Sequence, residues 1–317
     1  MFTAGAARGL YAGQAGLGRI LLDLRRLDVH PPLYFWALEI WRRLLGPGWF
    51  TARLLSAGVT LAGLYGLACI ARRLRVAAGP VLAMALLSYG FCYTAILARP
   101  YALAGALNIA GVGLALAAAE EGRRGPAWAA GLCLGAACFS EYLAVFTGVA
   151  ALLWLGWRRP GQAARALAAM LPWLAACGWV FLGQRDSRQG QFAPFSWHAA
   201  LAALARDGGA ALFGGLPLYA GAWRGAVAAL LGLLALLGLA LALRRRQSRG
   251  FLALAAATPA GLLALGLVFR ATPIEIRYLA FALPWLALAL APALPPWPRA
   301  LWLGAQALAV AGLVLAP

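Results

Sequence analysis

The hydrophobic residues of this 317-residue chain fall into long runs that are separated by short polar turns. Runs of this length are typical of helices that cross a bilayer, and about ten of them follow one another along the chain. The predicted spans are 49–72, 78–97, 101–120, 126–139, 142–157, 165–183, 223–243, 250–269, 278–293 and 299–316. The pattern therefore predicts an all-α polytopic membrane protein with a single membrane domain, 1–317.

A different pattern precedes the first span, in the stretch Leu27–Leu45, which reads LDVHPPLYFWALEIWRRLL. Two adjacent prolines favour extended backbone before them and can open a helix, here predicted at 32–45. Such a helix places Glu39, Arg42 and Arg43 on one face, at spacings of three and four residues. It is too short to cross a hydrocarbon core of roughly 30 Å. We therefore expect a helix that lies in the membrane interface, within a first outer loop, 1–48.

A second long polar segment, 184–222, separates the sixth predicted span from the seventh. Within it, Ser196 is a good N-cap for the sequence WHAALAALARD, and Gly208 with Gly209 is a plausible stop. The segment is predicted to form a second outer loop that contains a short helix.

The distribution of charge predicts which side of the membrane each loop faces. The chain is 64% hydrophobic and 11% charged, with a mean hydropathy of +0.80. Its 27 basic residues are all arginine and give a net charge of +18. Many of them cluster in short turns between spans, which is typical of cytoplasmic loops rather than of nucleic-acid binding. The predicted cytoplasmic clusters are Arg72/Arg73/Arg75, Arg123/Arg124, Arg158/Arg159/Arg165, Arg244/Arg245/Arg246/Arg249 and Arg299. The long loops and most of the acidic residues are then on the outer side.

Asp28 and His30, directly before the two prolines, are the first candidates for chemistry. In a functional interpretation Asp28 is an acid/base group and His30 contacts an anion such as phosphate. In the structural alternative Asp28 caps the turn and His30 fills an interface. The D-x-H spacing alone does not decide between them.

Other candidates lie at the predicted outer ends of spans. Arg99 with Tyr101, and Arg277 with Tyr278, each combine a planar guanidinium suited to phosphate with a phenolic donor. The alternative is that these residues only anchor the helices at the membrane surface. Glu141 interrupts the apolar run 126–157, and a carboxylate between two apolar helices indicates a functional site. With two histidines and five cysteines that form no C-x-x-C pair, no metal site or disulfide is predicted.

Three segments resemble one known family. The run DVHPPLYFW with its short helix, the segment ARPYAL and the segment EIRYLAFALPWLAL resemble the GT-C membrane glycosyltransferases. The most similar branch is the family-39-like group of dolichyl-phosphate-mannose–protein mannosyltransferases and lipid A aminoarabinose transferase relatives. The resemblance covers about residues 20–290.

The resemblance implies a function and a place in the cell. Such enzymes transfer a sugar from a polyprenyl-phosphate donor to a glycan, lipid or protein acceptor on the outer face, here of the bacterial inner membrane. The family's principal catalytic carboxylate has no counterpart in this chain, which leaves Asp28 and Glu141 as the candidate catalytic residues in its place. The resemblance implies donor-phosphate contacts from His30, Arg99, Tyr101, Arg277 and Tyr278. The cofactor stays open: the polyprenyl-phosphate sugar is the donor substrate, and a divalent metal is compatible with the motifs but is not indicated by them.

The resemblance also carries departures. The family's first transmembrane helix and the Asp-Glu pair after it have no counterpart, and Leu97 stands where the family usually has Glu. We therefore expect an in-frame upstream segment that encodes this helix and pair, and expect the 317-residue form without it to be inactive. The alternatives to a glycosyltransferase are a multi-spanning lipid or small-molecule transporter, and a degenerate relative without catalysis.

Overall fold

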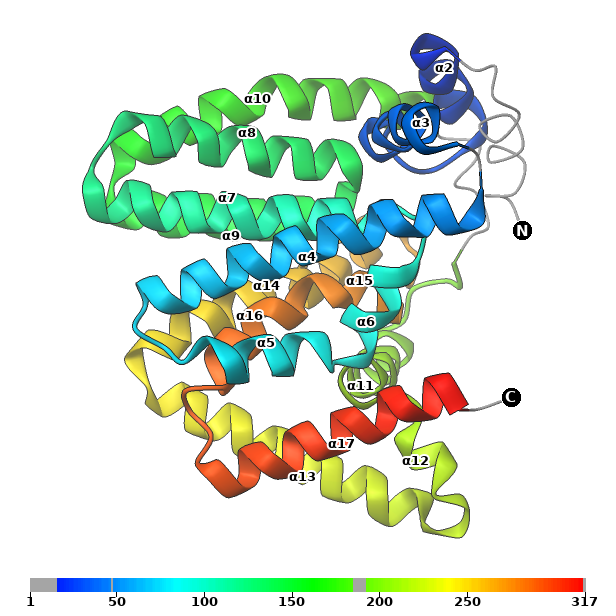
Figure 1. Cartoon of the computed structure of the whole chain (residues 1–317), viewed down its shortest axis with the longest axis vertical. Coiled ribbons are helices and arrows are strands. Elements are labelled where there is room, and N and C mark those ends of the chain that lie inside the picture. The colour runs from blue at the N-terminus through cyan, green and yellow to red at the C-terminus, as the bar shows by residue number, and fades with distance from the viewer. Residues whose placement is uncertain (1–15, 47, 185–191, 316–317) are drawn as a thin grey trace. The chain divides into compact units, whose positions relative to one another are not determined.

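The fold of the chain is almost entirely helical, which confirms the all-α prediction (Figure 1). The computed structural model describes residues 16–46, 48–184 and 192–315. Among these residues the only extended pairing is an isolated antiparallel bridge between Pro194 and Ala271. The chain divides into two compact units, Met1–Gly66 with Ala95–Gln191 and Leu67–Thr94 with Phe192–Pro317.

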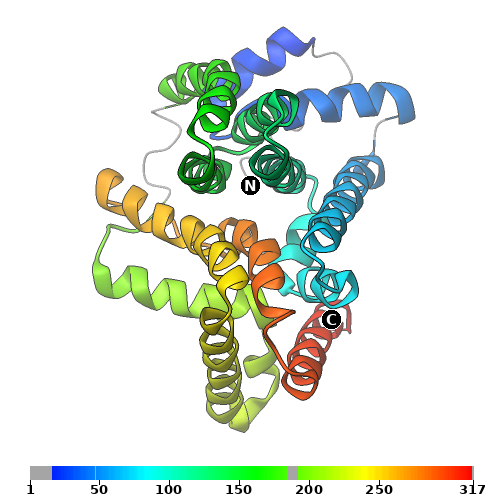
Figure 2. The ribbon, with the colours of Figure 1, turned by 90° about the vertical axis from the view of Figure 1, so that its left-hand side faces the viewer.

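The first unit is built around four helices that run side by side, α7 to α10 (Figures 1 and 2). Helix α8 packs along both α7 and α10, and α9 packs against the same two helices. The elements of this unit are α2 (Leu17–Leu27), α3 (Leu33–Leu45), the first part of α4 (Trp49–Arg73), α7 (Tyr101–Glu121), α8 (Arg124–Ser140), η1 (Tyr142–Ala144), α9 (Val145–Arg158) and α10 (Pro160–Gly183).

Glycines allow α8 to approach α10 closely. A Cβ atom at Gly131 would collide with the backbone carbonyl of Ala166, and one at Gly135 would collide with the side chain of Trp173. Small residues at helix contacts are the usual means of close packing between apolar helices, because lipid supplies no hydrophobic drive for their association. The approach of α8 to α10 therefore depends on these two positions.

The segment before the first span contains two helices, of which the sequence predicted one. The helix predicted at 32–45 is confirmed as α3, with Pro32 at its N-cap. Helix α2 was not predicted; residues 1–15 of the predicted outer loop lie outside the described chain. Ile20 and Leu24 of α2 are buried, and they share one hydrophobic cluster with residues of α3 and α4. The two short helices are therefore packed on the first unit through this cluster.

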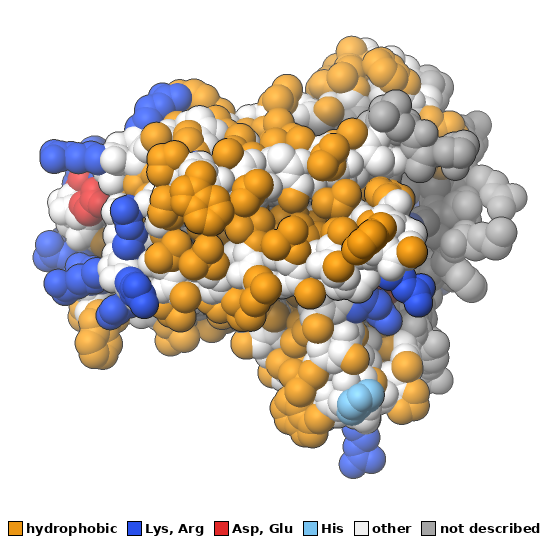
Figure 3. Space-filling model, turned by 90° about the horizontal axis from the view of Figure 1, so that it is seen from below, with side chains coloured by type: hydrophobic (Ala, Val, Ile, Leu, Met, Phe, Trp, Pro, Cys, Tyr) orange, Lys and Arg blue, Asp and Glu red, His pale blue; other side chains and the backbone are white. Residues whose placement is uncertain are grey.

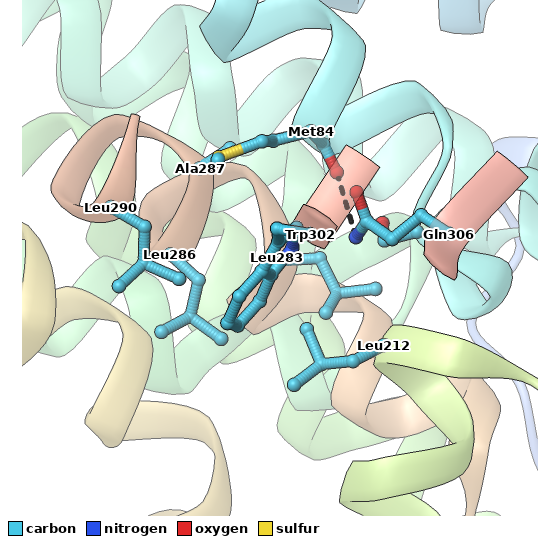
Figure 4. A pocket seen from close by; sticks show the side chains of 9 residues that line it. Met84, Leu212, Leu283, Leu286, Ala287, Leu290, Trp302 and Gln306 are labelled. Atoms are coloured by element: carbon cyan, nitrogen blue, oxygen red, sulfur yellow. Dashed lines mark hydrogen bonds between the residues drawn. The ribbon is translucent and has the colours of Figure 1, made fainter. Parts of the chain in front are cut away.

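The second unit holds the remaining helices around a core that includes two fully buried tryptophans, Trp285 and Trp302. Its elements are the last part of α4, α5 (Ala78–Leu86), α6 (Tyr89–Ile96), α11 (Trp197–Phe213), α12 (Leu216–Tyr219), η3 (Gly221–Trp223), α13 (Arg224–Arg244), α14 (Arg246–Phe269), α15 (Ile276–Leu279), η4 (Ala280–Ala282), α16 (Leu283–Leu290) and α17 (Pro296–Leu315). A small, mainly apolar pocket lies among α5, α11, α16 and α17 (Figure 4). At its edge Gln306 Nε2 donates to the carbonyl of Met84, at 3.3 Å.

The described helices do not confirm the predicted count of about ten spans. Five are long and apolar enough to cross a membrane, or six if α5 and α6 together form one broken span. The five are Trp49–Arg73, Tyr101–Glu121, Pro160–Gly183, Gly221–Arg244 and Arg246–Phe269. The run 78–97, predicted as one helix, is divided into α5 and α6, which are bent by 71°. The segments 142–157 and 278–293 correspond to shorter apolar helices, Tyr142–Arg158 and Ile276–Leu290.

The helix predicted in the second long loop is present, and it is longer than expected. Ser196 is its N-cap, since its hydroxyl oxygen accepts from the Ala199 N–H at 3.1 Å. The predicted stop at Gly208 and Gly209 was wrong, because α11 continues to Phe213. It ends at Gly214, which has a φ of 56°. A glycine ends a helix only where the backbone turns left-handed, and composition does not reveal which glycine does so.

The face of the molecule in Figure 3 is apolar over much of its area, and many of its arginines gather toward one edge. Leucines of α13 are among the exposed hydrophobic residues, with Leu230, Leu233 and Leu236 each about two-thirds exposed, at 66%, 65% and 64%. An apolar surface of this kind is expected where helices face lipid.

Substitution of Gly131 tests the packing of α8 on α10. We expect Gly131→Ala to lower the free energy of unfolding in detergent by about 1–3 kcal/mol, because the added methyl group overlaps a backbone carbonyl that cannot rotate away. Gly178→Ala is the matched control, since Gly178 lies in α10 with open space around it. The control should be neutral or more stable by about 0.5–1 kcal/mol. Equal effects of the two changes would contradict the close approach.

Candidate active site

The turn between α2 and α3 carries Asp28 and His30, and the Asp28 carboxylate organises it. Asp28 Oδ1 accepts from the backbone N–H of Val29 at 2.6 Å and from that of His30 at 3.3 Å. The same oxygen lies 2.7 Å from Nδ1 of the His30 ring. The two prolines that follow begin α3. Asp28 therefore organises the turn, as in the structural interpretation, and it also orients the imidazole; its role as an acid/base group stays a prediction.

The pKa of Asp28 shows which way the proton lies in this contact. Burial raises the pKa of this carboxyl, but the hydrogen bond and charge of His30 and the two backbone N–H groups outweigh burial and lower it below its ordinary value. Asp28 is then an ionised acceptor at neutral pH, so Nδ1 of His30 carries the hydrogen between them. The Nε2 atom of His30 is left to face the other side of the site.

Glu141 lies on that other side. Helix α8 ends at Ser140, and the Glu141 backbone is extended before η1 begins. Its Oε2 atom lies 3.7 Å from Nε2 of His30. Asp28, His30 and Glu141 are 7%, 8% and 4% exposed, so an imidazole is buried between two carboxylates. Low dielectric strengthens charge interactions inside such a cluster.

The segment Arg99-Pro100-Tyr101 borders the same cluster. The Ser140 hydroxyl donates to the carbonyl of Pro100 at 3.2 Å, which joins the end of α8 to the start of α7. The buried Tyr101 ring meets the His30 ring edge-on, with centroids 6.4 Å apart. Arg99 precedes this helix and is half-buried. The first unit thus brings together four predicted site residues, with Arg99 two residues before one of them.

Two residues of the site, Gln184 and Tyr142, were not among the candidates that the sequence predicted. Gln184 is fully buried just after α10, and its Nε2 donates to the carbonyls of Leu24 at 3.0 Å and His30 at 2.9 Å. Its Oε1 accepts from the hydroxyl of Tyr142 at 3.0 Å. The sequence feature that could have identified Gln184 is its position as the polar residue directly after the apolar run 165–183.

Arg277 and Tyr278 belong to the second unit and contact each other. Arg277 Nη2 donates to the Tyr278 hydroxyl at 3.3 Å, and its guanidinium carbon lies 5.0 Å from the Tyr278 ring centroid. Nε of Arg277 is also paired with the carboxylate of Glu275. The Tyr278 ring meets Phe192 edge-on at 6.4 Å. Among the described residues no group of three or more His, Cys, Asp or Glu could hold a metal ion.

The fold defines a helical membrane protein that contains a buried acid–histidine cluster, and comparison with known proteins narrows the class of protein further. Residues 29–183 match the family described as dolichyl-phosphate-mannose-protein mannosyltransferase. This match confirms the resemblance to the GT-C family over that part of the chain. It includes His30, Arg99, Tyr101 and Glu141. No curated protein matches the sequence.

Solved structures of a GT-C protein have a similar fold. The crystal structure of ArnT from Cupriavidus metallidurans in the apo state has 18% sequence identity and a TM-score of 0.60. The crystal structure of the same protein bound to undecaprenyl phosphate has 17% identity and a TM-score of 0.61. All of this chain is covered in both comparisons, but it spans only 64% of the length of each ArnT chain.

The contacts of Asp28 predict a pH dependence of stability. Because the pKa of Asp28 is lower in the folded state than in the unfolded chain, its contribution is fully present above the ordinary carboxyl pKa. The contribution is lost as the pH falls through the lowered value. We expect Asp28→Asn to lower the free energy of unfolding at neutral pH, and this difference from wild type to shrink below about pH 4. Chemical unfolding in detergent over a pH series measures it.

Asp23→Asn is the matched control for this prediction. Asp23 lies on α2 and pairs with Arg19 at 3.7 Å, where both side chains are largely exposed. An exposed ion pair contributes little to stability, so this change should give the same pH profile as wild type. Identical profiles for the two variants would contradict the assignment of Asp28 as a buried carboxylate.

Proposed function

We propose that this chain transfers a sugar, hexosyl or pentosyl, from a polyprenyl-phosphate-linked donor to an acceptor hydroxyl on the outer face of the bacterial inner membrane. The observation that carries the proposal is the buried Asp28–His30–Glu141 cluster, which is in contact with Tyr101. The family match over 29–183 and the ArnT-like fold support it. The ArnT structure that contains undecaprenyl phosphate supports the choice of donor lipid.

The reaction needs a group that accepts one proton. The acceptor oxygen forms a bond to the anomeric carbon of the sugar, and the bond from that carbon to the phosphate oxygen breaks. The bonding electron pair leaves with the phosphate, and the hydroxyl proton must go to a base. The products are the glycosylated acceptor and polyprenyl phosphate. No oxidant, reductant or further reactant is required.

The His30–Glu141 pair is suited to take this proton. Nδ1 of His30 faces the Asp28 carboxylate, and Nε2 of the same ring faces the Glu141 carboxylate. The 3.7 Å between Nε2 and Oε2 is longer than a hydrogen bond, and both atoms can bind a proton. In this proposal Glu141 and His30 together receive the proton of the acceptor hydroxyl, and Asp28 stabilises the imidazolium. These residues take the place of the family's Asp-Glu pair, so the chain is proposed to be active without that pair.

This assignment gives His30 a role that differs from the expected one. The family resemblance implied that His30 contacts the donor phosphate. A side chain between two carboxylates is poorly suited to binding the donor phosphate, because both negative charges repel a phosphate. We therefore propose Arg99 and Tyr101 as the phosphate contacts of the first unit, and Arg277 with Tyr278 as an anion contact of the second. Cationic donors stabilise the charge that develops on the leaving phosphate.

Removing the charge of Glu141 tests the proposed function. We expect Glu141→Gln to reduce kcat by about 10²–10⁴-fold, the usual contribution of a general acid or base. The measurement is transfer of radiolabelled sugar from undecaprenyl-phosphate-linked hexose and pentose to extracted envelope lipids and glycans. Glu121→Gln is the matched control, since Glu121 is the last residue of α7 and pairs with Arg123 at 3.5 Å. Full activity of Glu141→Gln would remove the carboxylate from the mechanism, and a wild type that transfers neither sugar would defeat the function.

Substitution of Arg277 tests the anion contact of the second unit. A hydrogen bond to a charged group contributes about 1.5–3 kcal/mol, so Arg277→Ala should raise the donor KM by about 10–150-fold. The melting temperature should change little, because the guanidinium is partly exposed. Arg270→Ala is the control, since the exposed Arg270 precedes the same turn. Equal donor KM values for the two variants would contradict this contact.

A further inference from the structure

The side-chain amide of Gln184 joins three segments that are distant in sequence. Its two carbonyl partners, Leu24 and His30, are 160 and 154 residues away, and its hydroxyl partner, Tyr142, is 42 residues away. All three distances lie between 2.9 and 3.0 Å. One buried amide therefore uses both of its N–H groups and its oxygen in contacts across the first unit.

The orientation of this amide is determined by its partners. Two backbone carbonyls can only accept, so the NH₂ group must face them. The amide oxygen then faces Tyr142, whose hydroxyl donates to it. Reversing the amide would place its oxygen against two carbonyl oxygens and leave buried groups unpaired, which is costly in an apolar interior. The Gln184 side chain is consequently held in a single arrangement.

The three partners of Gln184 lie in the chain segments that carry Asp28, His30 and Glu141, the residues proposed for proton transfer. The Leu24 carbonyl also accepts from the Asp28 N–H at 3.2 Å, so it anchors the beginning of the turn. The His30 carbonyl belongs to the histidine itself, and Tyr142 directly follows Glu141. His30 and Glu141 are too far apart to hold each other by a direct hydrogen bond. Their separation must therefore be set by the backbone segments that Gln184 connects.

We propose that Gln184 is a positioning residue that sets the separation between His30 and Glu141. The inference rests on the proposed function and adds to it a residue that touches neither substrate. Proton transfer is sensitive to geometry, and a misplacement of about 1 Å can cost about 10²-fold in rate. The amide has no charge and takes no proton, so its part is purely one of placement.

The experiment compares Gln184→Met with Gln162→Met in the full chain. Methionine keeps the approximate shape of glutamine and removes its hydrogen bonds. Gln162 is the matched control, because it is a buried glutamine near the other end of α10, the helix that directly precedes Gln184. Its Nε2 donates to the carbonyl of Gly122, remote from His30. We expect Gln184→Met to lower kcat by about 10²-fold with the donor KM changed less than about threefold. Gln162→Met should retain the wild-type kcat.

Tyr142→Phe provides a second variant that removes one hydroxyl and leaves the fold intact. It should lower kcat, and its effect should be smaller in the Gln184→Met background, because both changes break the same contact. If Gln184→Met does not fold, Tyr142→Phe decides the question. A wild-type kcat for Tyr142→Phe, or for a folded Gln184→Met, would overturn the inference.

A measurement that does not depend on activity separates this inference from the proposed function. The chain has two histidines, so a His198→Gln background leaves His30 as the single source of imidazole ¹⁵N signals. These signals should shift in Gln184→Met and remain in place in Gln162→Met. Unchanged ¹⁵N signals in Gln184→Met would refute the proposal that Gln184 positions His30. Absence of sugar transfer by wild type, with the shift present, would refute the function and leave the placement of His30 by Gln184 supported.

Discussion

The candidate site depends on one constraint, namely that polar groups buried among apolar helices must find partners inside the protein. Each buried group left unpaired costs about 1–3 kcal/mol, and in this chain the surroundings are mostly alanine, leucine and glycine. In the turn that carries Asp28 and His30, the Asp28 carboxylate pairs with polar groups of the turn itself. Gln184, from a distant segment, pairs with the His30 carbonyl. The hydrogen bonds that satisfy this turn are also those that orient the imidazole.

Helix packing places the second half of the site. Close approach of α8 to α10, through Gly131 and Gly135, determines where α8 ends. Ser140 at that end bonds to the start of α7, and the next residue is Glu141. The carboxylate therefore reaches His30 because two apolar helices are in close contact. The packing glycines of α8 and the carboxylate that directly follows this helix are parts of one arrangement.

Predictions from the sequence succeeded where a local pattern has a single structural solution. Two prolines before an amphipathic run predicted α3, Ser196 predicted the start of α11, and Glu141 predicted the break after α8. They failed where several solutions share one pattern. Ile20 and Leu24 lie four residues apart on the buried face of α2. The glycines and arginines before this helix made the helical spacing of its apolar residues hard to recognise. The run 78–97 is apolar enough for one helix, and nothing in its composition shows the bend between α5 and α6.

The sequence by itself determined the class of protein, most of the helical segments and the chemical types of most candidate site residues. Long apolar runs, arginine-rich turns and the D-x-H-P-P motif suffice for these, because each depends on residues close together in the chain. The tertiary structure decided which candidates meet. It placed Glu141 and Tyr101 beside His30, and it made Gln184 the common partner of three segments. Contacts across 42 to 160 residues leave no periodicity in the sequence, because the packing of whole helices determines them.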